Sequence, residues 1–286
     1  MRHSDYASIH GGHSGQFCLH ATDSLEAIVL KYITTGFAWV GITEHMPPID
    51  NRFRYPDQVA AGQDLTFLEQ QFDEYMSELR RLKDKYAETI TLLVGFETET
   101  LSGYESYIPA LIQKYNPDYI VGSIHHVEDM GFDISPQGYE SAALNLGGLD
   151  NLYCRFFDQQ LCMLRTLEPQ VVGHFDLIRI FDNQYRDRIL KKPIWDRIVR
   201  NLDFIRDKNL ILDFNLRALN KGAQEPYIAG PILKLAREYG IRVAPGDDSH
   251  GTGDIGRHMD TGLALLKKAG FPPPWPIPGL PGKGLL

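Results

Sequence analysis

The stretch IRVAPGDDSHG, residues 241–251, joins a short apolar run to two carboxylates and a histidine. Residues 241–244 predict a β-strand, and Asp247, Asp248 and His250 follow it closely. Toward the N-terminus the same pattern recurs, in which a short apolar run is followed by polar or charged residues. It predicts further strands at residues 7–10, 39–43, 89–96, 119–123, 171–173 and 210–214.

Longer amphipathic stretches separate these apolar runs. They predict helices at residues 24–35, 65–86, 149–167, 193–207, 230–239 and 260–269. Strands that alternate with helices form βα units around a parallel sheet. The predicted class is therefore α/β, and about seven strands suit either a barrel or an open doubly wound sheet.

The composition is that of an ordinary globular enzyme, with 43% hydrophobic and 23% charged residues. The formal net charge of -8 argues against a general nucleic-acid or anionic-membrane surface. An anionic substrate stays possible, because bound cations invert the local field. The three cysteines lack zinc-finger spacing and cannot all pair with one another, which fits a reducing compartment. Residues 1–9 are polar and do not resemble a signal peptide, and no apolar run is long enough for a membrane span. We therefore expect a cytoplasmic protein.

The chain shows no interdomain linker before its last residues. Residues 271–286, FPPPWPIPGLPGKGLL, are too rich in proline for a helix or a central strand. We expect one domain over residues 1–270, followed by an extended or disordered tail over residues 271–286.

Metal-binding and charged side chains follow every predicted strand. In chain order they are His10, His13 and His20; Glu44 and His45; Glu97 and Glu99; His125 and His126; His174, Asp176 and Arg179; Asn215, Arg217 and Lys221; Asp247, Asp248 and His250. In a parallel barrel the carboxyl ends of the strands converge on one face, where active sites are built. Imidazoles mixed with carboxylates suit zinc, iron or manganese, and this set is too large for one ion. The sequence therefore predicts a multinuclear site with a bridging carboxylate.

Each residue alone has a plainer explanation. A single histidine at a strand end is more often a hydrogen-bonded structural residue. Asp247 and Asp248 could cap the next segment, Glu44 and Asp176 could orient a neighbouring histidine, and Arg179 could form a surface ion pair. These explanations must account for every strand end separately, whereas one metal site accounts for all of them.

The predicted site suits hydrolysis of a phosphate ester. Two neighbouring ions lower the pKa of a bridging water, and the hydroxide attacks phosphorus in line. A third ion or an arginine can bind the remaining phosphate oxygens. The chain contains neither a GxxxxGK[ST] nor a GxGxxG loop, and no GxSxG elbow is evident.

As an ordered set, the motifs HSGQFCLHA, GITEHMPP, the Glu of GFETE, GSIHHV, VGHFDL and GDDSHG resemble the PHP superfamily. They most resemble its histidinol-phosphate phosphatase branch, the fungal and yeast members in particular, and the resemblance runs from about His10 to His250. It implies a distorted TIM-like (β/α)7 barrel that hydrolyses L-histidinol phosphate to L-histidinol and phosphate. The expected partner is this small phosphomonoester, with no nucleic acid or membrane.

The resemblance also implies three divalent ions, of zinc, manganese or iron. His13, Glu97 and Asp248 would hold the first ion. Glu97 would bridge to the second, which His125 and His174 complete. His20, His45 and His250 would hold the third. On this basis Glu97, Asp248 and His250 are expected to be catalytic, and Arg179, Arg217 and His126 to bind the substrate.

The first departure from the family pattern is at Gly11. The family opens with His-x-His, and both histidines bind the first ion, but Gly11 stands two positions before His13. His10 could serve as the ligand if Gly11 and Gly12 let the backbone bend. Otherwise the first site is weakened, and the chain is a slow or inactive metal-binding homologue.

The second departure concerns the phosphate-binding arginine. Relatives often carry Asn-Thr-Ser-x-Leu-Arg-Lys where this chain has NLRALNK, residues 215–221, so Asn220 stands at the usual arginine position. Arg217 could supply the charge from a different place. A PHP phosphoesterase for another small phosphomonoester is the remaining alternative, because a fold does not fix a substrate.

Overall fold

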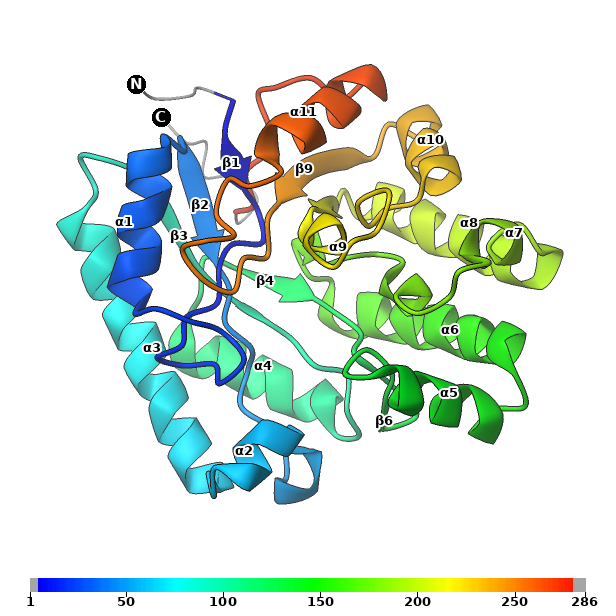
Figure 1. Cartoon of the computed structure of the whole chain (residues 1–286), viewed down its shortest axis with the longest axis horizontal. Coiled ribbons are helices and arrows are strands. Elements are labelled where there is room, and N and C mark those ends of the chain that lie inside the picture. Colours follow the sequence, from blue (N-terminus) through cyan, green and yellow to red (C-terminus); the bar gives the residue numbers. More distant parts are fainter. Residues whose placement is uncertain (1–4, 280–286) are drawn as a thin grey trace.

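A parallel sheet forms the centre of the computed structural model, which describes residues 5–279 (Figure 1). Among these residues seven strands follow the order of the chain, and each pairs in parallel with the next. They are β1 (Ala7–Ser8), β2 (Trp39–Ile42), β3 (Thr91–Glu97), β4 (Tyr119–Gly122), β7 (Val171–Val172), β8 (Ile211–Asn215) and β9 (Arg242–Gly246). The predicted α/β class and the seven strands of the parallel sheet are confirmed.

The residue after β1 brings the first and last strands together. The Ile9 amide donates to the Pro245 carbonyl on β9 at 2.8 Å, and the Gly11 amide donates to the Gly41 carbonyl on β2 at 2.8 Å. The chain thus bonds alternately to its two neighbours. This explains why β1 is shorter than predicted and why the barrel is distorted and nearly closed.

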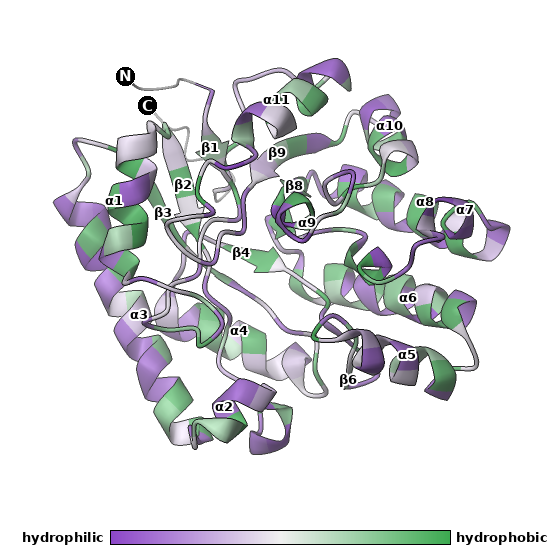
Figure 2. Ribbon diagram, viewed as in Figure 1, coloured by the Kyte–Doolittle hydropathy of each residue, from purple (hydrophilic) through white to green (hydrophobic). Residues whose placement is uncertain are grey.

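Helices surround the barrel, with their apolar faces toward the sheet (Figures 1 and 2). The longer ones are α1 (Leu25–Thr35), α3 (Leu65–Lys85), α4 (Tyr104–Tyr115), α5 (Pro136–Asn145), α6 (Leu149–Leu167), α8 (Lys192–Asp207), α10 (Gly230–Glu238) and α11 (Met259–Lys268). Short turns complete the set: η1 (Asn51–Phe53), α2 (Pro56–Ala60), η2 (Leu177–Arg179), α7 (Tyr185–Arg188) and α9 (Arg217–Asn220).

Helix α3 shows how the sequence produces this packing. Its N-cap Asp64 accepts a hydrogen bond from the Phe67 amide at 2.9 Å, which satisfies a donor that the helix leaves free. Its buried residues recur at spacings of three and four, so one face is apolar. On that face the Tyr75 hydroxyl donates to the Gly95 carbonyl at 2.6 Å and fixes the helix against β3.

Sequence patterns did not predict α4, α5 or the antiparallel hairpin of β5 (His126–Val127) and β6 (Met130–Gly131). Helix α4 contains Pro109, which normally argues against a helix interior. The hairpin is inserted between β4 and β7 and leads into α5. It places residues 132–135 beside the carboxyl ends of the strands.

Residues 271–279 of the expected tail pack against the domain. Phe271 and Trp275 are buried, and Trp275 Nε1 donates to the Asp5 carbonyl at 2.7 Å. This part is extended, with neither helix nor strand, and its aromatic side chains bury apolar surface. Residues 280–286 lie outside the described residues. No helix within residues 5–279 has the length and apolar composition to cross a membrane.

Candidate metal centre

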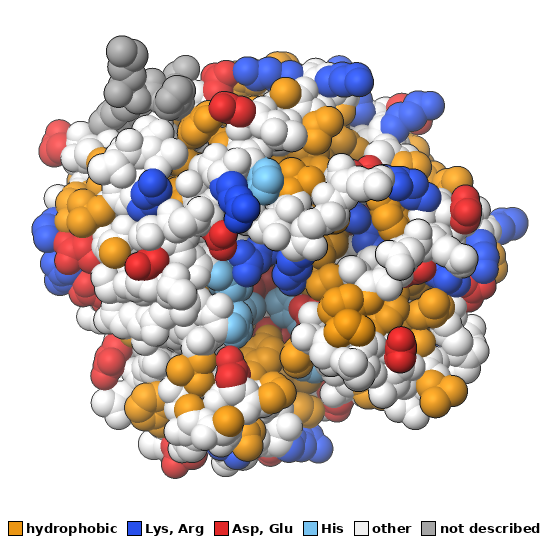
Figure 3. Space-filling model, viewed as in Figure 1, with side chains coloured by type: hydrophobic (Ala, Val, Ile, Leu, Met, Phe, Trp, Pro, Cys, Tyr) orange, Lys and Arg blue, Asp and Glu red, His pale blue; other side chains and the backbone are white. Residues whose placement is uncertain are grey.

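The polar strand endings meet in a hollow in the face shown in Figure 3, where histidines are visible inside it. A cavity of ≈ 410 Å³ opens there. Its lining includes ligands predicted from six different strand endings: His20, His45, Glu97, His125, His174, Asp248 and His250. These strand ends therefore form one site, as the barrel geometry predicts.

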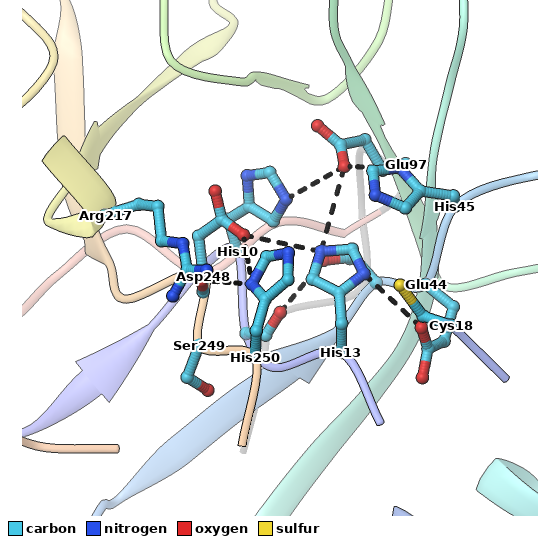
Figure 4. A network of polar contacts seen from close by, with 12 residues as sticks. His10, His13, Cys18, Glu44, His45, Glu97, Arg217, Asp248, Ser249 and His250 are labelled. Carbon is cyan, nitrogen blue, oxygen red and sulfur yellow. Dashed lines mark hydrogen bonds and ion pairs between the residues drawn. The ribbon is translucent and has the colours of Figure 1, made fainter. Parts of the chain in front are cut away.

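Glu97, the last residue of β3, lies between two sets of imidazoles. Its Oε2 faces the ring nitrogens of three histidines, namely His10 at 3.6 Å, His13 at 3.8 Å and His45 at 3.1 Å (Figure 4). Its Oε1 faces His174 Nε2 at 2.9 Å and His125 Nε2 at 3.3 Å. This arrangement suits a carboxylate that bridges two ions.

Asp248 and three less buried histidines extend the cluster. Asp248 Oδ1 lies 3.4 Å from His13 Nε2 and 3.6 Å from His250 Nδ1 (Figure 4). His20, His45 and His250 each offer a ring nitrogen within 4.8 Å of the others. The structure thus brings together all nine predicted ligands, and the sets expected for the three ions are each contiguous.

A second layer of carboxylates orients the buried imidazoles. Glu44 Oε2 lies 3.3 Å from His13 Nδ1, and Glu44 Oε1 accepts hydrogen bonds from the Ser14 amide and hydroxyl, both at 2.7 Å. Glu99 Oε1 lies 2.8 Å from His125 Nδ1. Such contacts fix the ring and direct its other nitrogen toward a metal.

The position of His10 bears on the alternative that Gly11 left open. Its side chain is fully buried in the cluster, Nδ1 lies 3.0 Å from Asp213 Oδ2, and the Asp248 amide donates to the His10 carbonyl at 2.9 Å. A Cβ on Gly11 would lie 2.4 Å from the Gly41 carbonyl oxygen, so that position faces β2 and not the site. His10, not position 11, therefore lies among the ligands expected for the first ion.

The donor set fits divalent metal ions. The Nε2 atoms of His10 and His13 are buried without a hydrogen bond among residues 5–279, although carboxylate oxygens lie within 4 Å of them. These two imidazole nitrogens and the nearby carboxylate oxygens thus point toward a common centre but do not form hydrogen bonds with one another. Ligands around a shared metal ion are arranged in this way. Imidazoles mixed with carboxylates suit zinc, iron or manganese.

Two cationic residues of the loop after β8 also line the cavity. Figure 4 shows Arg217 reaching from α9 toward Asp248 and His250. Its NH1 group pairs with Asp254 Oδ2 at 2.7 Å, while its Nε is buried with no acceptor among the described residues. Lys221 is exposed and lines the same cavity. In Figure 3, Lys and Arg side chains gather at the upper rim of the hollow and hydrophobic ones at the lower rim.

The family model described as "PHP domain" matches residues 11–217. The chain belongs to the PHP family. A Schizosaccharomyces pombe protein described as "Probable histidinol-phosphatase" is 35% identical over 263 residues, which cover 91% of this chain and 85% of the relative. The histidinol-phosphatase of Saccharomyces cerevisiae is 30% identical over 281 residues, which cover 86% and 84%.

Solved structures confirm the PHP barrel. A Listeria monocytogenes structure matches with a TM-score of 0.77 at 25% identity and covers 89% of this chain and 99% of that chain. The Lactococcus lactis histidinol phosphate phosphatase, solved with zinc, L-histidinol and phosphate, matches with a TM-score of 0.73 at 19% identity and covers 93% and 94%. The predicted fold and family are therefore confirmed.

The buried carboxylates of the PHP site are held in their charged form. Burial alone would raise the pKa of Glu97, but the imidazoles of His10 and His125 hold it well below its usual range. Burial likewise disfavours a charged His13, yet Asp248 and Glu44 outweigh it and raise its pKa to about 9. Without a metal ion these carboxylates therefore favour a protonated His13, and a cation bound among these side chains would replace that proton.

His20 has the opposite shift. Burial together with the neighbouring His45 and His13 lowers its pKa to about 4. Near neutral pH its imidazole is therefore uncharged, as a metal ligand must be.

The predicted phosphate-binding role of Arg179 is not supported. Arg179 is 4% exposed and does not line the cavity. Its Nε donates to Asp176 Oδ2 at 2.9 Å, and its NH2 group donates to the Pro226 carbonyl at 2.5 Å. The guanidinium also packs on the rings of Tyr185 and Tyr227, at 4.6 and 4.7 Å from their centroids. With Nε and NH2 bonded to protein groups, Arg179 links η2 to the segment at Pro226 outside the cavity lining.

His126 also lies elsewhere than predicted. It is 8% exposed and does not line the cavity, because its Nδ1 is directed toward Glu99 Oε2 at 3.3 Å. Its carbonyl accepts a hydrogen bond from Gln159 Nε2 at 2.8 Å. His126 therefore helps to place Glu99, which orients His125.

Asp213 is a site residue that sequence reasoning missed. It lies inside β8, and its Oδ2 accepts hydrogen bonds from Asn215 Nδ2 at 2.9 Å and from the His174 amide at 3.3 Å, in addition to its contact with His10. A carboxylate inside an apolar predicted strand was the available signal, since a buried charge needs partners.

Proposed function

We propose that this PHP chain is a metal-dependent histidinol-phosphatase, which hydrolyses L-histidinol phosphate to L-histidinol and phosphate. The observation that carries the proposal is the position of Glu97 between two sets of imidazoles. The yeast relative named histidinol-phosphatase and the Lactococcus lactis complex with zinc, L-histidinol and phosphate support the same substrate.

We infer three ions from the grouping of the ligands. His10, His13, Glu97 and Asp248 would hold one ion, Glu97, His125 and His174 a second, and His20, His45 and His250 a third. Zinc, manganese and iron all suit this donor set. When bound, such ions supply a nucleophilic water at neutral pH and neutralise the charge of the phosphate.

The cationic residues of α9 and its following turn bind the phosphate in this proposal. Arg217 offers its buried Nε, which has no acceptor among residues 5–279, and Lys221 adds a second positive charge. Asp254 holds the Arg217 guanidinium in position. Donors that are oriented in advance bind a charged group at little entropic cost.

Glu97, Asp248 and His250 are the proposed catalytic residues, because all three line the cavity and belong to the cluster. His250 Nδ1 lies 3.0 Å from the Asp248 carbonyl, which keeps the proton on Nδ1 and leaves Nε2 as an acceptor. Asp248 and Glu97 remain charged through their histidine neighbours.

The alternative of a weakened homologue depended on Gly11. The burial of His10 in the cluster and its contact with Asp213 support His10 as the replacement ligand, and so favour an active enzyme in our proposal.

Cys18, Cys154 and Cys162 form no disulfide among the described residues, which supports a reducing compartment, the cytoplasm in our proposal.

The direct test measures phosphate release from L-histidinol phosphate and metal content on the same sample. Release together with close to three ions per chain is expected. Three ions without release would contradict the proposed substrate. Two or fewer ions without release would contradict the assignment of His10 as a ligand.

A further inference from the structure

The cavity above the metal centre contains a carboxylate that the metal site does not use. Four acidic residues line this cavity within the described residues, namely Asp57, Glu97, Asp133 and Asp248. Glu97 and Asp248 face the imidazole cluster. Asp57 accepts a hydrogen bond from the Gln58 amide at 2.8 Å and lies 3.4 Å from His20 Nδ1. Asp133 is the remaining one.

Asp133 has no hydrogen bond or ion pair to any residue in the range 5–279, and its Oδ1 is buried. Burying a carboxylate oxygen without a donor costs free energy, because the oxygen loses water and gains no partner. Burial and nearby carboxylates, Glu99 and Asp133 among them, raise the pKa of Tyr55, which lines the same cavity. The field of Asp133 thus extends into the cavity, where a cation would be stabilised.

The backbone on both sides of Asp133 is fixed. The Phe132 amide donates to the His125 carbonyl at 3.2 Å, and the Phe132 ring is fully buried. On the other side, Ser135 caps α5 by accepting a hydrogen bond from the Gly138 amide at 3.1 Å. Asp133 is therefore held in place by the hairpin and by α5, and is not a mobile surface carboxylate.

The wall around Asp133 is largely apolar or aromatic. Ile134 is 50% exposed although it is a large hydrophobic residue, and it lines the cavity together with Leu177 and Tyr227. The cationic side chains that line the cavity, Arg217 and Lys221, come from another loop. The cavity thus combines cations and metal ligands suited to a phosphate with a lone anion beside apolar surface suited to an organic cation.

L-Histidinol phosphate has this distribution of groups. Its ammonium group is on the carbon next to the phosphate-ester carbon, and an imidazolylmethyl group is attached to the same carbon. We propose that Asp133 binds the substrate ammonium group and thereby selects phosphate esters of amino alcohols. This inference rests on the proposed function and adds a specificity-determining residue to it.

The test compares L-histidinol phosphate with its deamino analogue, 3-(imidazol-4-yl)propyl phosphate, in the wild type and in Asp133→Asn. The kcat/KM for L-histidinol phosphate is expected to fall about 10- to 100-fold in the variant, as for the loss of a charge-assisted hydrogen bond. The kcat/KM for the analogue should change less than about 3-fold, because it has no ammonium group to lose. Calorimetry should show the same loss for L-histidinol as a ligand and no loss for inorganic phosphate.

Asp129→Asn is the matched control. Asp129 is on the same hairpin, but it bonds the Ser102 amide at 2.8 Å and does not line this cavity. It should leave the kinetics of both substrates unchanged, and both variants should keep the wild-type metal content and melting temperature. An equal loss on both substrates in Asp133→Asn, or no loss on either, would overturn the inference. Absence of activity of the wild type on L-histidinol phosphate would instead refute the proposed function.

Discussion

His10 Nδ1 lies 3.0 Å from Asp213 Oδ2, and both side chains are completely buried. The carboxylate keeps a proton on Nδ1, so that the Nε2 lone pair is directed into the cluster, 3.6 Å from Glu97 Oε2. In our proposal a histidine displaced by one position along the sequence serves in place of the usual one, because Asp213 fixes its ring.

Asp213→Asn should weaken metal binding. An amide holds the His10 ring less strongly and makes it a poorer ligand, so we expect a loss of about 10- to 100-fold in affinity for the most weakly held ion. Metal titration followed by calorimetry measures this, and excess metal should restore activity. Asp182→Asn is the control, since Asp182 is a buried carboxylate that pairs with Arg188 outside the cluster. Unchanged affinity in Asp213→Asn would refute the orienting role.

Gly11→His should not improve the enzyme, although the family pattern places a histidine at this position. Its Cβ would meet the Gly41 carbonyl oxygen at 2.4 Å and Val40 Cγ2 at 2.6 Å. We expect the free energy of unfolding to fall by about 1–3 kcal/mol, with no gain in kcat. Thermal melting and phosphate release measure both effects. Gly253→Ala is the control, because no heavy atom lies near the added Cβ. A large gain in rate would show that His10 does not serve as the ligand.

Glu97→Ala should abolish most activity. Both sets of imidazoles lose the carboxylate between them, so the ions lose their common ligand. A fall in kcat of about 10³-fold or more, equivalent to about 4 kcal/mol, is expected together with a lower metal content. Glu105→Ala, at an exposed position of α4, is the control. A near-normal rate with full metal content would rule out the bridging role.

Arg217→Ala should weaken phosphate binding without removing metal. We expect the inhibition constant of inorganic phosphate to rise about 10- to 100-fold, as for the loss of charge-assisted hydrogen bonds. Asp254→Asn keeps the guanidinium but removes the carboxylate that holds it, so it should cause a smaller loss. An unchanged inhibition constant in Arg217→Ala would contradict the phosphate contact.

Arg179→Met should act on stability and not on phosphate. The substitution leaves Asp176 buried without its cation, and breaking such a pair costs about 3–5 kcal/mol. Denaturant unfolding should show this loss. In the folded, metal-loaded fraction, inhibition by inorganic phosphate should remain at the wild-type value. A selective loss of phosphate affinity would restore the role predicted from the sequence.

The positions of the ligands along the chain were predictable, because strand ends of a parallel barrel converge whatever the details of packing. The directions of side chains were not. His125 and His126 are adjacent, so their side chains point to different sides, and only the tertiary structure shows that His125 faces Glu97. Arg179 follows β7 at the correct end of the barrel, yet its 3-10 helix directs it toward Asp176.

Asp213 and Asp133 illustrate a second limit of sequence patterns. Asp213 is a single acidic residue in an apolar run, and Asp133 follows no predicted strand directly, so the importance of each depends on what surrounds it in space. The role of Asp213 requires the register of β8 beside β9, and that of Asp133 requires the hairpin between β4 and β7. Neither follows from local spacing.

The backbone contacts between residues 9–10 and residues 245–248 have a consequence for how the protein is made. His10 and His13 leave the ribosome early, while Asp248 and His250 emerge more than two hundred residues later. The amide of Asp248 is also the donor that holds the His10 carbonyl. Closure of contacts so distant in sequence is a slow and late step of folding. A nascent or truncated chain that lacks β9 therefore cannot assemble the ion cluster, and complete metal loading reports that synthesis has passed residue 250 and that the barrel has closed.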